Sequence, residues 1–208
     1  MFDKNKVIEK LKSHKPYING SENMRKAAVF IPIVQNGGEP HILFEVRAST
    51  LNHRPSEISF PGGGIEPGEK PFEAAIRETH EEIGVQERDL KIITDLDLLV
   101  TPVSYIIHPY VGYLDSGAKL SLNKDEVDHV FTVPLKYLLE NQPKMYQNII
   151  SVTPASNLPF EYIPGGKNYK FEKGPCSVIF YKYEDYIIWG ITAKILYNFL
   201  EFFKYEDK

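Results

Sequence analysis

A glycine-rich loop that leads into a capped helix is the feature that most constrains how this chain folds. Residues 58–70 contain four glycines and two prolines, a content that predicts an irregular loop. Pro71 at the start, Glu73 in the first turn and Gly84 just beyond the end predict a helix over residues 71–83. At about 100° per residue, one arc of this helix is expected to be buried, and it holds Phe72, Ala75, Ile76, Thr79 and Ile83.

A second arc of the same helix carries three carboxylates, Glu78, Glu81 and Glu82. Like charges at this spacing repel one another and destabilise a helix unless a proton or a cation lies between them. A run of glutamates alone is more often a solvated helix face, but a solvated face does not need three successive glycines just upstream. Such glycines let the backbone approach a metal or a diphosphate closely. Because oxygen ligands favour hard cations, the two features together predict a site for Mg²⁺ or Mn²⁺.

Two neighbouring features have simpler alternatives. Arg77 lies one turn before Glu81, so it forms a surface ion pair or orients a carboxylate. The glycine loop nearly matches a phosphate-binding P-loop, but Glu69 and Lys70 stand where that motif requires lysine and Ser/Thr. The P-loop interpretation therefore fails.

Hydrophobic patterning predicts strands on both sides of the central helix. Apolar runs at 27–34 and 41–47 flank a turn-forming stretch and predict a hairpin. Further strands are expected at 92–93, 98–100, 106–114 and 177–183, and helices around Val7, Ile8 and Leu11, at 134–139 and at 188–203. No element is assigned between 140 and 174, where Pro, Asn and Gly are frequent. The pattern predicts a mixed α/β layered domain and does not define the strand order.

The charge and the cysteine content exclude several classes of protein. Twenty-four basic and 28 acidic residues give a net charge of −4, which argues against binding to nucleic acid or to an anionic membrane. Cys176 is the only cysteine, which excludes an internal disulfide or a multi-cysteine metal site, and a buried structural thiol is expected. The charged N-terminus is unlike a secretory signal, and no segment approaches the roughly 18 apolar residues of a membrane span. The expected location is the cytoplasm.

The loop and the helix together resemble the Nudix box, with the pattern Gly63-x5-Glu69-x7-Arg77-Glu78-x2-Glu81-Glu82-x-Gly84-Val85. Every fixed position of the pattern over residues 63–85 is matched. Thr79 stands where the family usually has an aliphatic residue, and it keeps a β-branched shape, so only a slightly less stable helix is expected.

This resemblance implies a single Nudix hydrolase domain over residues 1–208, with an N-terminal helical extension of about 1–22. The implied fold is a Nudix-like layered α/β fold with a mixed β-sheet between helices. Nudix enzymes bind Mg²⁺ or Mn²⁺ and cleave the diphosphate of a nucleoside diphosphate linked to another moiety. Carried over to this sequence, the resemblance makes Glu78, Glu81 and Glu82 the metal-binding group, with the Gly63 carbonyl as a further ligand and an Arg77–Glu69 ion pair that braces the motif.

A second resemblance, to coenzyme A pyrophosphatases, extends over much of the chain. It rests on residues 43–49, 53–63, 101–102, 109–112, 126–127, 131–135 and 188–193. The sequence departs from that pattern at Ser56, where glycine is common, and in the register of an arginine, which falls on His53 or Arg54. A coenzyme A pocket needs cations for the 3′-phosphate and an apolar groove for the pantetheine arm. Candidate substrate-binding residues are Arg47, His53, Arg54, Gly62 and Gly63.

The resemblance implies hydrolysis of the diphosphate of coenzyme A or an acyl-coenzyme A, which gives 3′,5′-ADP and 4′-phosphopantetheine. Water is the nucleophile, and the sequence leaves the general base open among Glu78, Glu81, Glu82 and the downstream Glu126. Another small nucleotide diphosphate, such as ADP-ribose or NADH, is the alternative substrate. A non-catalytic nucleotide-binding module is the alternative class, against which the complete glutamate set argues. The oligomeric state is not defined by the sequence, and a homodimer is one option.

Overall fold

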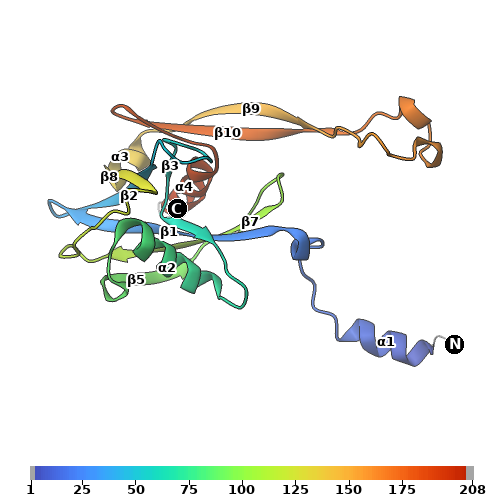
Figure 1. Ribbon diagram of the computed structural model, residues 1–208, viewed down its shortest axis with the longest axis horizontal. Helices are drawn as coiled ribbons and strands as arrows, with labels where there is room; N and C mark the ends of the chain where they lie inside the picture. Colours follow the sequence, from blue (N-terminus) through green and yellow to red (C-terminus); the bar gives the residue numbers. More distant parts are fainter. Residues whose placement is uncertain (1–2, 205–208) are drawn as a thin grey trace.

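Strand β1 (Arg25–Asn36) lies at the centre of the larger sheet of the computed structural model, which describes residues 3–204 (Figure 1). The ends of the predicted domain, residues 1–2 and 205–208, lie outside this range. The larger sheet also contains β2 (Glu39–Arg47), β3 (Ile58–Ser59), β4 (Gly62–Gly64), β5 (Leu90–Asp95), β6 (Leu99–Val100), β7 (Tyr105–Leu114) and β8 (Val127–Pro134). The order β3-β2-β1-β7-β5 forms its main path, while β4 pairs with β1, β6 with β7 and β8 with β2.

The sheet is mixed, as the sequence predicts. β1 and β2 form the expected antiparallel hairpin, and β1 also pairs in parallel with β7. This parallel pairing sets the strand order that the sequence does not define.

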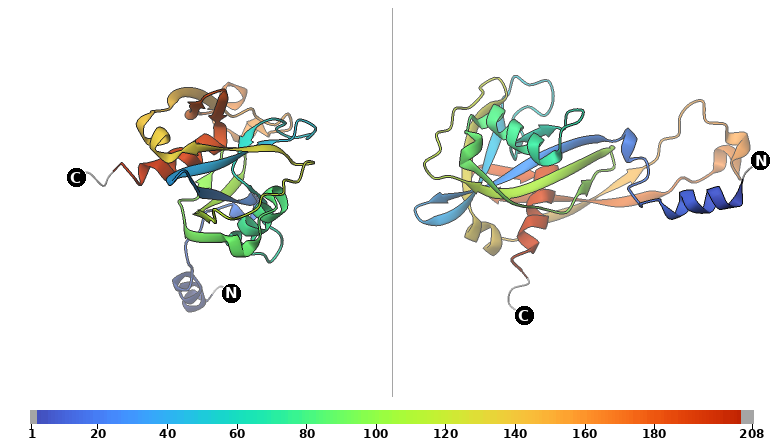
Figure 2. Two further views of the ribbon diagram at one scale, coloured as in Figure 1. Left: turned by 90° about the vertical axis from the view of Figure 1, so that its left-hand side faces the viewer. Right: turned by 90° about the horizontal axis from the view of Figure 1, so that it is seen from below.

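Helices cover both faces of the larger sheet because buried residues of β1 alternate between them. Ala28 and Phe30 pack with Ala74 and Ala75 of helix α2 (Pro71–Ile83). Ile31 and Ile33 belong to the opposite cluster, which contains α4 (Gly190–Glu201). Two views turned by 90° from Figure 1 show these layers (Figure 2). The predicted mixed sheet between helices is confirmed.

A second, three-stranded sheet was only partly predicted. It consists of β9 (Lys144–Ser151), β10 (Lys173–Tyr183) and β11 (Tyr186–Trp189) in the order β11-β10-β9. β9 lies in the stretch where no element is assigned, and all eight of its residues are exposed, so no buried periodicity marks it. β10 begins at residue 173 rather than 177, and residues 188–189 continue β11 instead of starting the last helix. The last helix begins at Gly190, whose φ is +65°.

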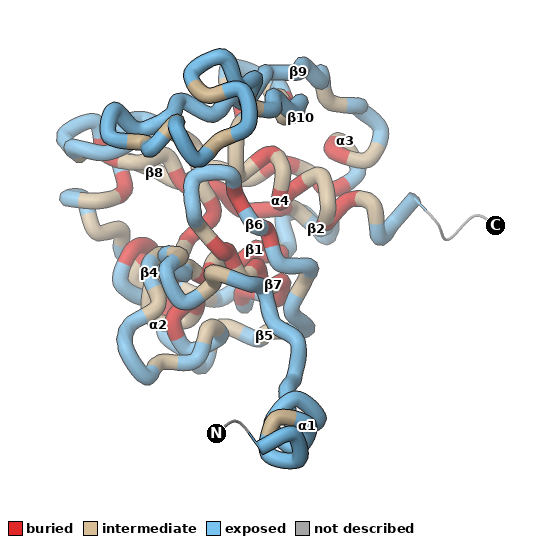
Figure 3. The backbone as a smooth tube through the Cα atoms, turned by 90° about the vertical axis from the view of Figure 1, so that its right-hand side faces the viewer, coloured by how far each residue is buried: buried red, intermediate tan, exposed pale blue. Residues whose placement is uncertain are grey.

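The remaining helices are short. The helix α3 (Leu135–Glu140) confirms the helix expected near 134–139. The helix α1 (Lys4–Lys12) confirms the one expected around Val7, but it buries no residue and lies apart from the body (Figures 1 and 3). No helix among residues 3–204 has both the length and the apolar content needed to cross a membrane.

Three local expectations are wrong. The loop over 58–70 is partly regular, because β3 pairs with β2 and the three glycines of β4 pair with β1. Phe72 is 40% exposed because it lies in the first turn of α2, away from the sheet, and Ile76 is only half-buried. Ala74 and Glu82 are buried instead. Cys176 is half-buried rather than buried, because it lies in the exposed part of β10.

We expect Leu196→Ala to lower the free energy of unfolding by about 2–5 kcal/mol, because it leaves a cavity where α4 packs between the two sheets. Leu196 is fully buried in the main core cluster. Ile149→Ala on β9 is the control: Ile149 is 73% exposed, so a change within about 0.5 kcal/mol is expected. Urea unfolding of both variants measures the difference, and equal losses would contradict this assignment of the core.

Candidate active site

The position of α2 depends on small residues at its contact with β1 and on both of its ends. Ala74 and Ala75 let the helix approach Ala28 closely. Pro71 starts the helix, and the Lys70 backbone amide donates to the Glu73 carboxylate at 3.0 Å. The helix ends at Gly84, whose φ is +71° and where a Cβ would overlap the Ser121 carbonyl. The helix is therefore fixed by its contact with β1 and by both of its ends.

Glu82 is the buried member of the three carboxylates on the second arc of α2. Its residue surface is only 4% exposed, and its Oε2 accepts a hydrogen bond from the Gly62 backbone amide at 2.8 Å. Burial, followed by the like charge of Glu45, raises the pKa of Glu82. Glu82 therefore connects the helix to the glycine strand β4.

Glu45 on β2 is a buried carboxylate that the sequence analysis missed. It is fully buried, and Ser59 Oγ donates to its Oε1 at 2.8 Å. Its Oε2 has no hydrogen-bond partner among the described residues. Burial raises the pKa of Glu45, with smaller contributions from the charges of Glu126 and Glu78. A glutamate inside an otherwise apolar strand run was the available signal.

Glu78 is half-buried and lies against the backbone of Gly63. A Cβ at Gly63 would overlap the Glu78 carboxylate, so only glycine leaves room for this packing. Burial raises the pKa of Glu78, and a hydrogen bond from Arg77 partly offsets this effect. The neighbouring Gly62 has a φ of +153°, and a Cβ there would overlap the Ala28 carbonyl oxygen. Both glycines are therefore required for close packing.

Arg77 connects the outer carboxylates to the loop. Its Nε and Nη2 donate to the two carboxylate oxygens of Glu69 at 2.8 and 3.1 Å, and Nη2 also donates to the Gly64 carbonyl at 3.0 Å. Its Nη1 donates to Glu78 at 2.9 Å and to Glu81 at 3.1 Å. The predicted Arg77–Glu69 ion pair is confirmed, and the hydrogen bond from Arg77 lowers the pKa of Glu69. Arg77 also orients Glu78 and Glu81.

Thr79 is accommodated inside the helix packing. It is fully buried, and its hydroxyl donates to the Ala75 carbonyl at 2.6 Å. The polar atom that replaces the usual aliphatic side chain is therefore satisfied.

Glu126 is carried to the same region by the segment before β8. The Asn123 backbone amide donates to the Glu82 carbonyl at 2.9 Å, and the Ala48 amide donates to the Glu126 carbonyl at 2.8 Å. Glu126 is half-buried, and its charge contributes to the raised pKa of both Glu45 and Glu78. The structure thus brings Glu126 near the carboxylates of α2, although it lies far from them in the sequence.

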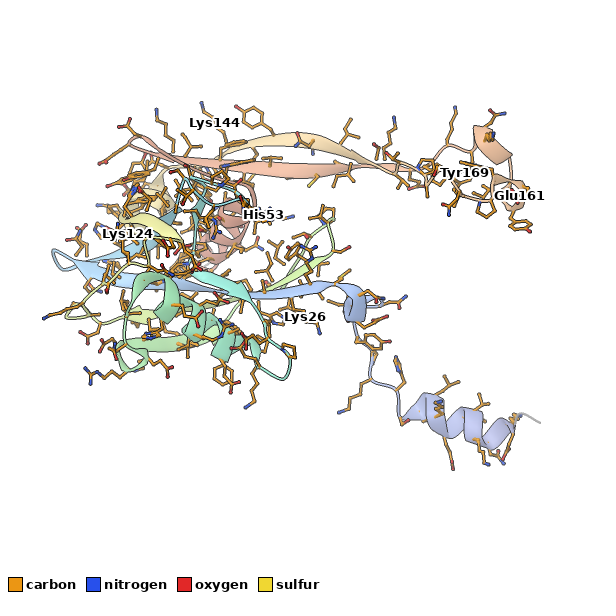
Figure 4. All side chains as sticks on the ribbon, in the orientation of Figure 1. Lys26, His53, Lys124, Lys144, Glu161 and Tyr169 are labelled. Atoms are coloured by element: carbon orange, nitrogen blue, oxygen red, sulfur yellow. The ribbon has the colours of Figure 1, made fainter. Side chains whose placement is uncertain are left out.

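A cavity of about 800 Å³ contains all five residues that the sequence proposes for substrate binding: Arg47, His53, Arg54, Gly62 and Gly63. Two further cations, Arg25 and Lys26 at the start of β1, also line it and were not foreseen, although their adjacency in the sequence was the available signal. Figure 4 labels Lys26 and, in the loop after β2, His53. The cavity also has an apolar lining that includes Ile58, Phe60, Ile107, Ile191 and Ile195.

The carboxylates and the cavity meet at the glycine strand. The Gly62 amide donates to the Glu82 carboxylate, Gly63 contacts Glu78, and both glycines line the cavity. Arg54 adopts a φ of +53° and lies 4.0 Å from the Glu57 carboxylate, a weak ion pair that leaves its guanidinium available in the cavity. Another cavity, of about 840 Å³, lies on the three-stranded sheet between Tyr146 and Trp189, away from these carboxylates.

The residues present suit a divalent cation by their chemistry. Within residues 3–204, no three His, Cys, Asp or Glu side chains are already gathered as metal ligands. Glu45, Glu78 and Glu82 nevertheless form an oxygen-only set whose pKa values are raised by burial, and one oxygen of Glu45 is unpartnered. Glu78 accepts a hydrogen bond from the Arg77 guanidinium, which places a positive charge next to the same cluster. A hard cation would offset the charge that Arg77 offsets only in part.

Comparison with known proteins places this arrangement in a family. The family model described as "NUDIX domain" matches residues 24–156, so the chain belongs to the Nudix family. The chain is 30% identical over 179 residues to an uncharacterized Nudix hydrolase NudL of Photorhabdus laumondii, covering 86% of this chain and 84% of that one. It is 36% identical over 173 residues to the mouse peroxisomal coenzyme A diphosphatase NUDT7, covering 82% of this chain and 66% of the mouse protein.

A third relative, Nudix hydrolase 3 of Caenorhabditis elegans, is 28% identical over 192 residues, covering 90% of this chain and 77% of that protein. The protein is thus a Nudix hydrolase, an enzyme that acts on small nucleoside diphosphate derivatives, and such hydrolases generally use divalent metal ions. The predicted family and enzyme class are confirmed.

We expect Gly63→Ala to lower the hydrolysis rate at least about tenfold, because the added Cβ displaces the Glu78 carboxylate. Gly64→Ala is the matched control, since a Cβ there meets no atom within 4 Å. Initial rates with a nucleoside diphosphate derivative and a divalent metal measure both. A Gly63→Ala variant as active as the wild type would show that contact with Gly63 does not set the position of Glu78.

Proposed function

We propose that this Nudix hydrolase uses Mg²⁺ or Mn²⁺ to split the diphosphate of coenzyme A or an acyl-coenzyme A into 3′,5′-ADP and 4′-phosphopantetheine. One observation carries the proposal: a single cavity joins the cations of residues 47–54, the glycines beside the carboxylates and an apolar lining. The named activity of the mouse relative supports the same substrate class.

The parts of coenzyme A correspond to the parts of this cavity. The diphosphate would lie at Gly62 and Gly63, beside Glu78. Arg54, with His53 as a second candidate, would pair with the 3′-phosphate through a charge-assisted hydrogen bond. The pantetheine arm would contact the apolar lining, for example Ile107 and Ile191. Arg47 would add a positive charge next to the diphosphate.

The carboxylates of α2 divide the chemical work. Glu78, Glu81 and Glu82 would hold the metal, with the Gly63 carbonyl as a further ligand, and Arg77 would keep Glu78 and Glu81 in position. The cation supplies positive charge that offsets the charge developing on the diphosphate oxygens. A water attacks one phosphorus atom, the bridging P–O bond breaks, and a glutamate accepts the proton of the water. That base is one of Glu78, Glu81, Glu82 and Glu126.

Three further features stay proposals. The single-domain organisation of residues 1–208, with α1 in an N-terminal extension of about 1–22, agrees in its central part with the family match over 24–156. The cytoplasm is the proposed location, and a reducing compartment suits the lone Cys176. The proposed oligomeric state is a homodimer.

Hydrolysis of ADP-ribose or NADH is the second candidate function. Ser56 departs from the coenzyme A pyrophosphatase pattern, and Arg25 and Lys26 place additional cations in the cavity. These cations suit any substrate with a diphosphate, so they do not depend on a 3′-phosphate. A module that binds nucleotides without hydrolysis has less support, because the carboxylate set of the box is complete.

With Mg²⁺, we expect coenzyme A to be hydrolysed faster than ADP-ribose or NADH. EDTA should abolish the activity, because it removes the divalent cation that the oxygen ligands of the proposed metal site would hold. Glu82→Gln should lower kcat at least about 100-fold, while Glu87→Gln, on an exposed turn, should not. Chromatography of the products measures each rate. Faster turnover of ADP-ribose would contradict the substrate assignment, and full activity in EDTA would contradict the metal.

Arg54→Ala should remove most of a preference for coenzyme A over 3′-dephospho-coenzyme A. One charge-assisted contact made in the transition state corresponds to roughly 10- to 150-fold in kcat/KM. Turnover of the dephospho compound should stay nearly unchanged, because the carboxylates of α2 are not altered. Arg88→Ala, on an exposed turn, is the control. If the wild type hydrolyses both compounds equally well, the 3′-phosphate does not determine specificity, and the role proposed for Arg54 is wrong.

A further inference from the structure

We propose that Glu45 belongs to the metal centre: its free carboxylate oxygen and the carboxylate of Glu82 together hold one divalent cation between β2 and α2. This inference rests on the proposed metal-dependent function. It adds a residue that lies outside the Nudix box and on a different element of the fold.

The first argument is the unpartnered oxygen of Glu45. Buried polar atoms in folded proteins nearly always have a hydrogen-bond partner, so an exception needs an explanation. Glu45 is fully buried, and Ser59 occupies Oε1 at 2.8 Å, while Oε2 has no partner among the described residues. A free oxygen on an otherwise fixed carboxylate is what a metal ligand requires.

The second argument is the position of Glu82. Ser59 donates to Glu45, and Gly62 donates to Glu82 at 2.8 Å. Ser59 and Gly62 are the two ends of the short segment that connects β3 to β4. The two carboxylates are therefore attached to the same four-residue segment, and each is at least 96% buried, since Glu82 is 4% exposed and Glu45 is not exposed at all.

The third argument is the charge balance around the pair. Arg77 donates to Glu69, Glu78 and Glu81 and has no hydrogen bond to Glu45 or Glu82. Arg47, two residues from Glu45 on β2, makes no hydrogen bond through its Nε among the described residues. The charge of Arg47 lowers the pKa of both Glu45 and Glu82 and so offsets part of their repulsion, but within residues 3–204 no arginine donates a hydrogen bond to either carboxylate. Two neighbouring buried carboxylates, whose charge one nearby guanidinium offsets only in part, offer the oxygen ligands that Mg²⁺ or Mn²⁺ prefers.

The same geometry gives Ser59 a positioning role. Its hydroxyl holds Oε1 of Glu45, which fixes the direction of Oε2. Ser59 also lines the cavity, next to Phe60 and Gly62. A cation held by Glu45 and Glu82 would therefore lie directly behind the backbone segment that forms the wall of the substrate cavity.

The test is a titration of the whole, substrate-free protein with Mn²⁺, followed by electron paramagnetic resonance. We expect Glu45→Gln to weaken the tightest Mn²⁺ binding at least about tenfold, as expected for Glu82→Gln, or to remove one bound ion per chain. Glu87→Gln should bind Mn²⁺ like the wild type. Unchanged binding by Glu45→Gln together with weakened binding by Glu82→Gln would overturn the role of Glu45 and leave the proposed function standing.

Unchanged binding by both variants would instead overturn the proposed metal site itself. Melting temperatures without and with Mn²⁺ check the fold. Glu45→Gln keeps the side-chain shape and removes a buried charge, so the metal-free variant should melt no lower than the wild type and gain less on addition of Mn²⁺. Should that variant not fold, Ser59→Ala keeps both carboxylates and should weaken Mn²⁺ binding about tenfold. Wild-type affinity in Ser59→Ala would then overturn the proposal.

Discussion

The hydrogen bond from the Gly62 amide to the buried Glu82 carboxylate is the contact on which the arrangement of the site depends. It joins β4, which pairs with the central strand β1, to α2 through a buried carboxylate, where a polar group without a partner would be costly. The backbone at Gly62 reaches that position only because glycine allows its φ of +153° beside β1. With this hydrogen bond in place, Gly63 lies against Glu78, and the wall of the substrate cavity lies next to the carboxylates of α2.

Charge on the two sides of α2 is balanced in different ways. On the outer side, a single guanidinium, that of Arg77, satisfies Glu69, Glu78 and Glu81 together. On the inner side, Glu82 and Glu45 are removed from water, which raises the pKa of both, and the charge of Glu45 raises the pKa of Glu82 further, while the charge of Arg47 partly offsets these effects. Burial of two like charges is costly without a counter-ion. On the side of α2 that faces the sheet, the negative charge of Glu45 and Glu82 is therefore only partly compensated, and a bound cation would offset the remainder.

The sequence predicts local features well and long-range ones poorly. The bounds of α2 follow from Pro71 and Gly84, and the Arg77–Glu69 pair follows from the Nudix pattern. A glutamate in an apolar strand run marks Glu45 as unusual, but its neighbours could not be predicted, because it joins the site through pairing of β2 with β3, a contact that no local pattern encodes. Helical spacing placed Glu82 with Glu78 and Glu81 on a second arc, apart from the buried one, and did not predict that Glu82 is the buried member of the three. Helical periodicity groups residues by angle, whereas the approach of β4 decides which of them is covered.

The ribbon formed by β9 and β10 extends well beyond the body (Figure 1), and it is exposed along much of its length (Figure 3). Core residues such as Ile179 and Tyr181 lie only near its base, where α4 packs. A two-stranded ribbon without a hydrophobic face is marginally stable by itself. Its outer part can therefore open and close as a separate cooperative unit, at a free-energy cost well below that of global unfolding. Evolution can lengthen, shorten or decorate that part of the chain without altering the geometry at the glycine strand.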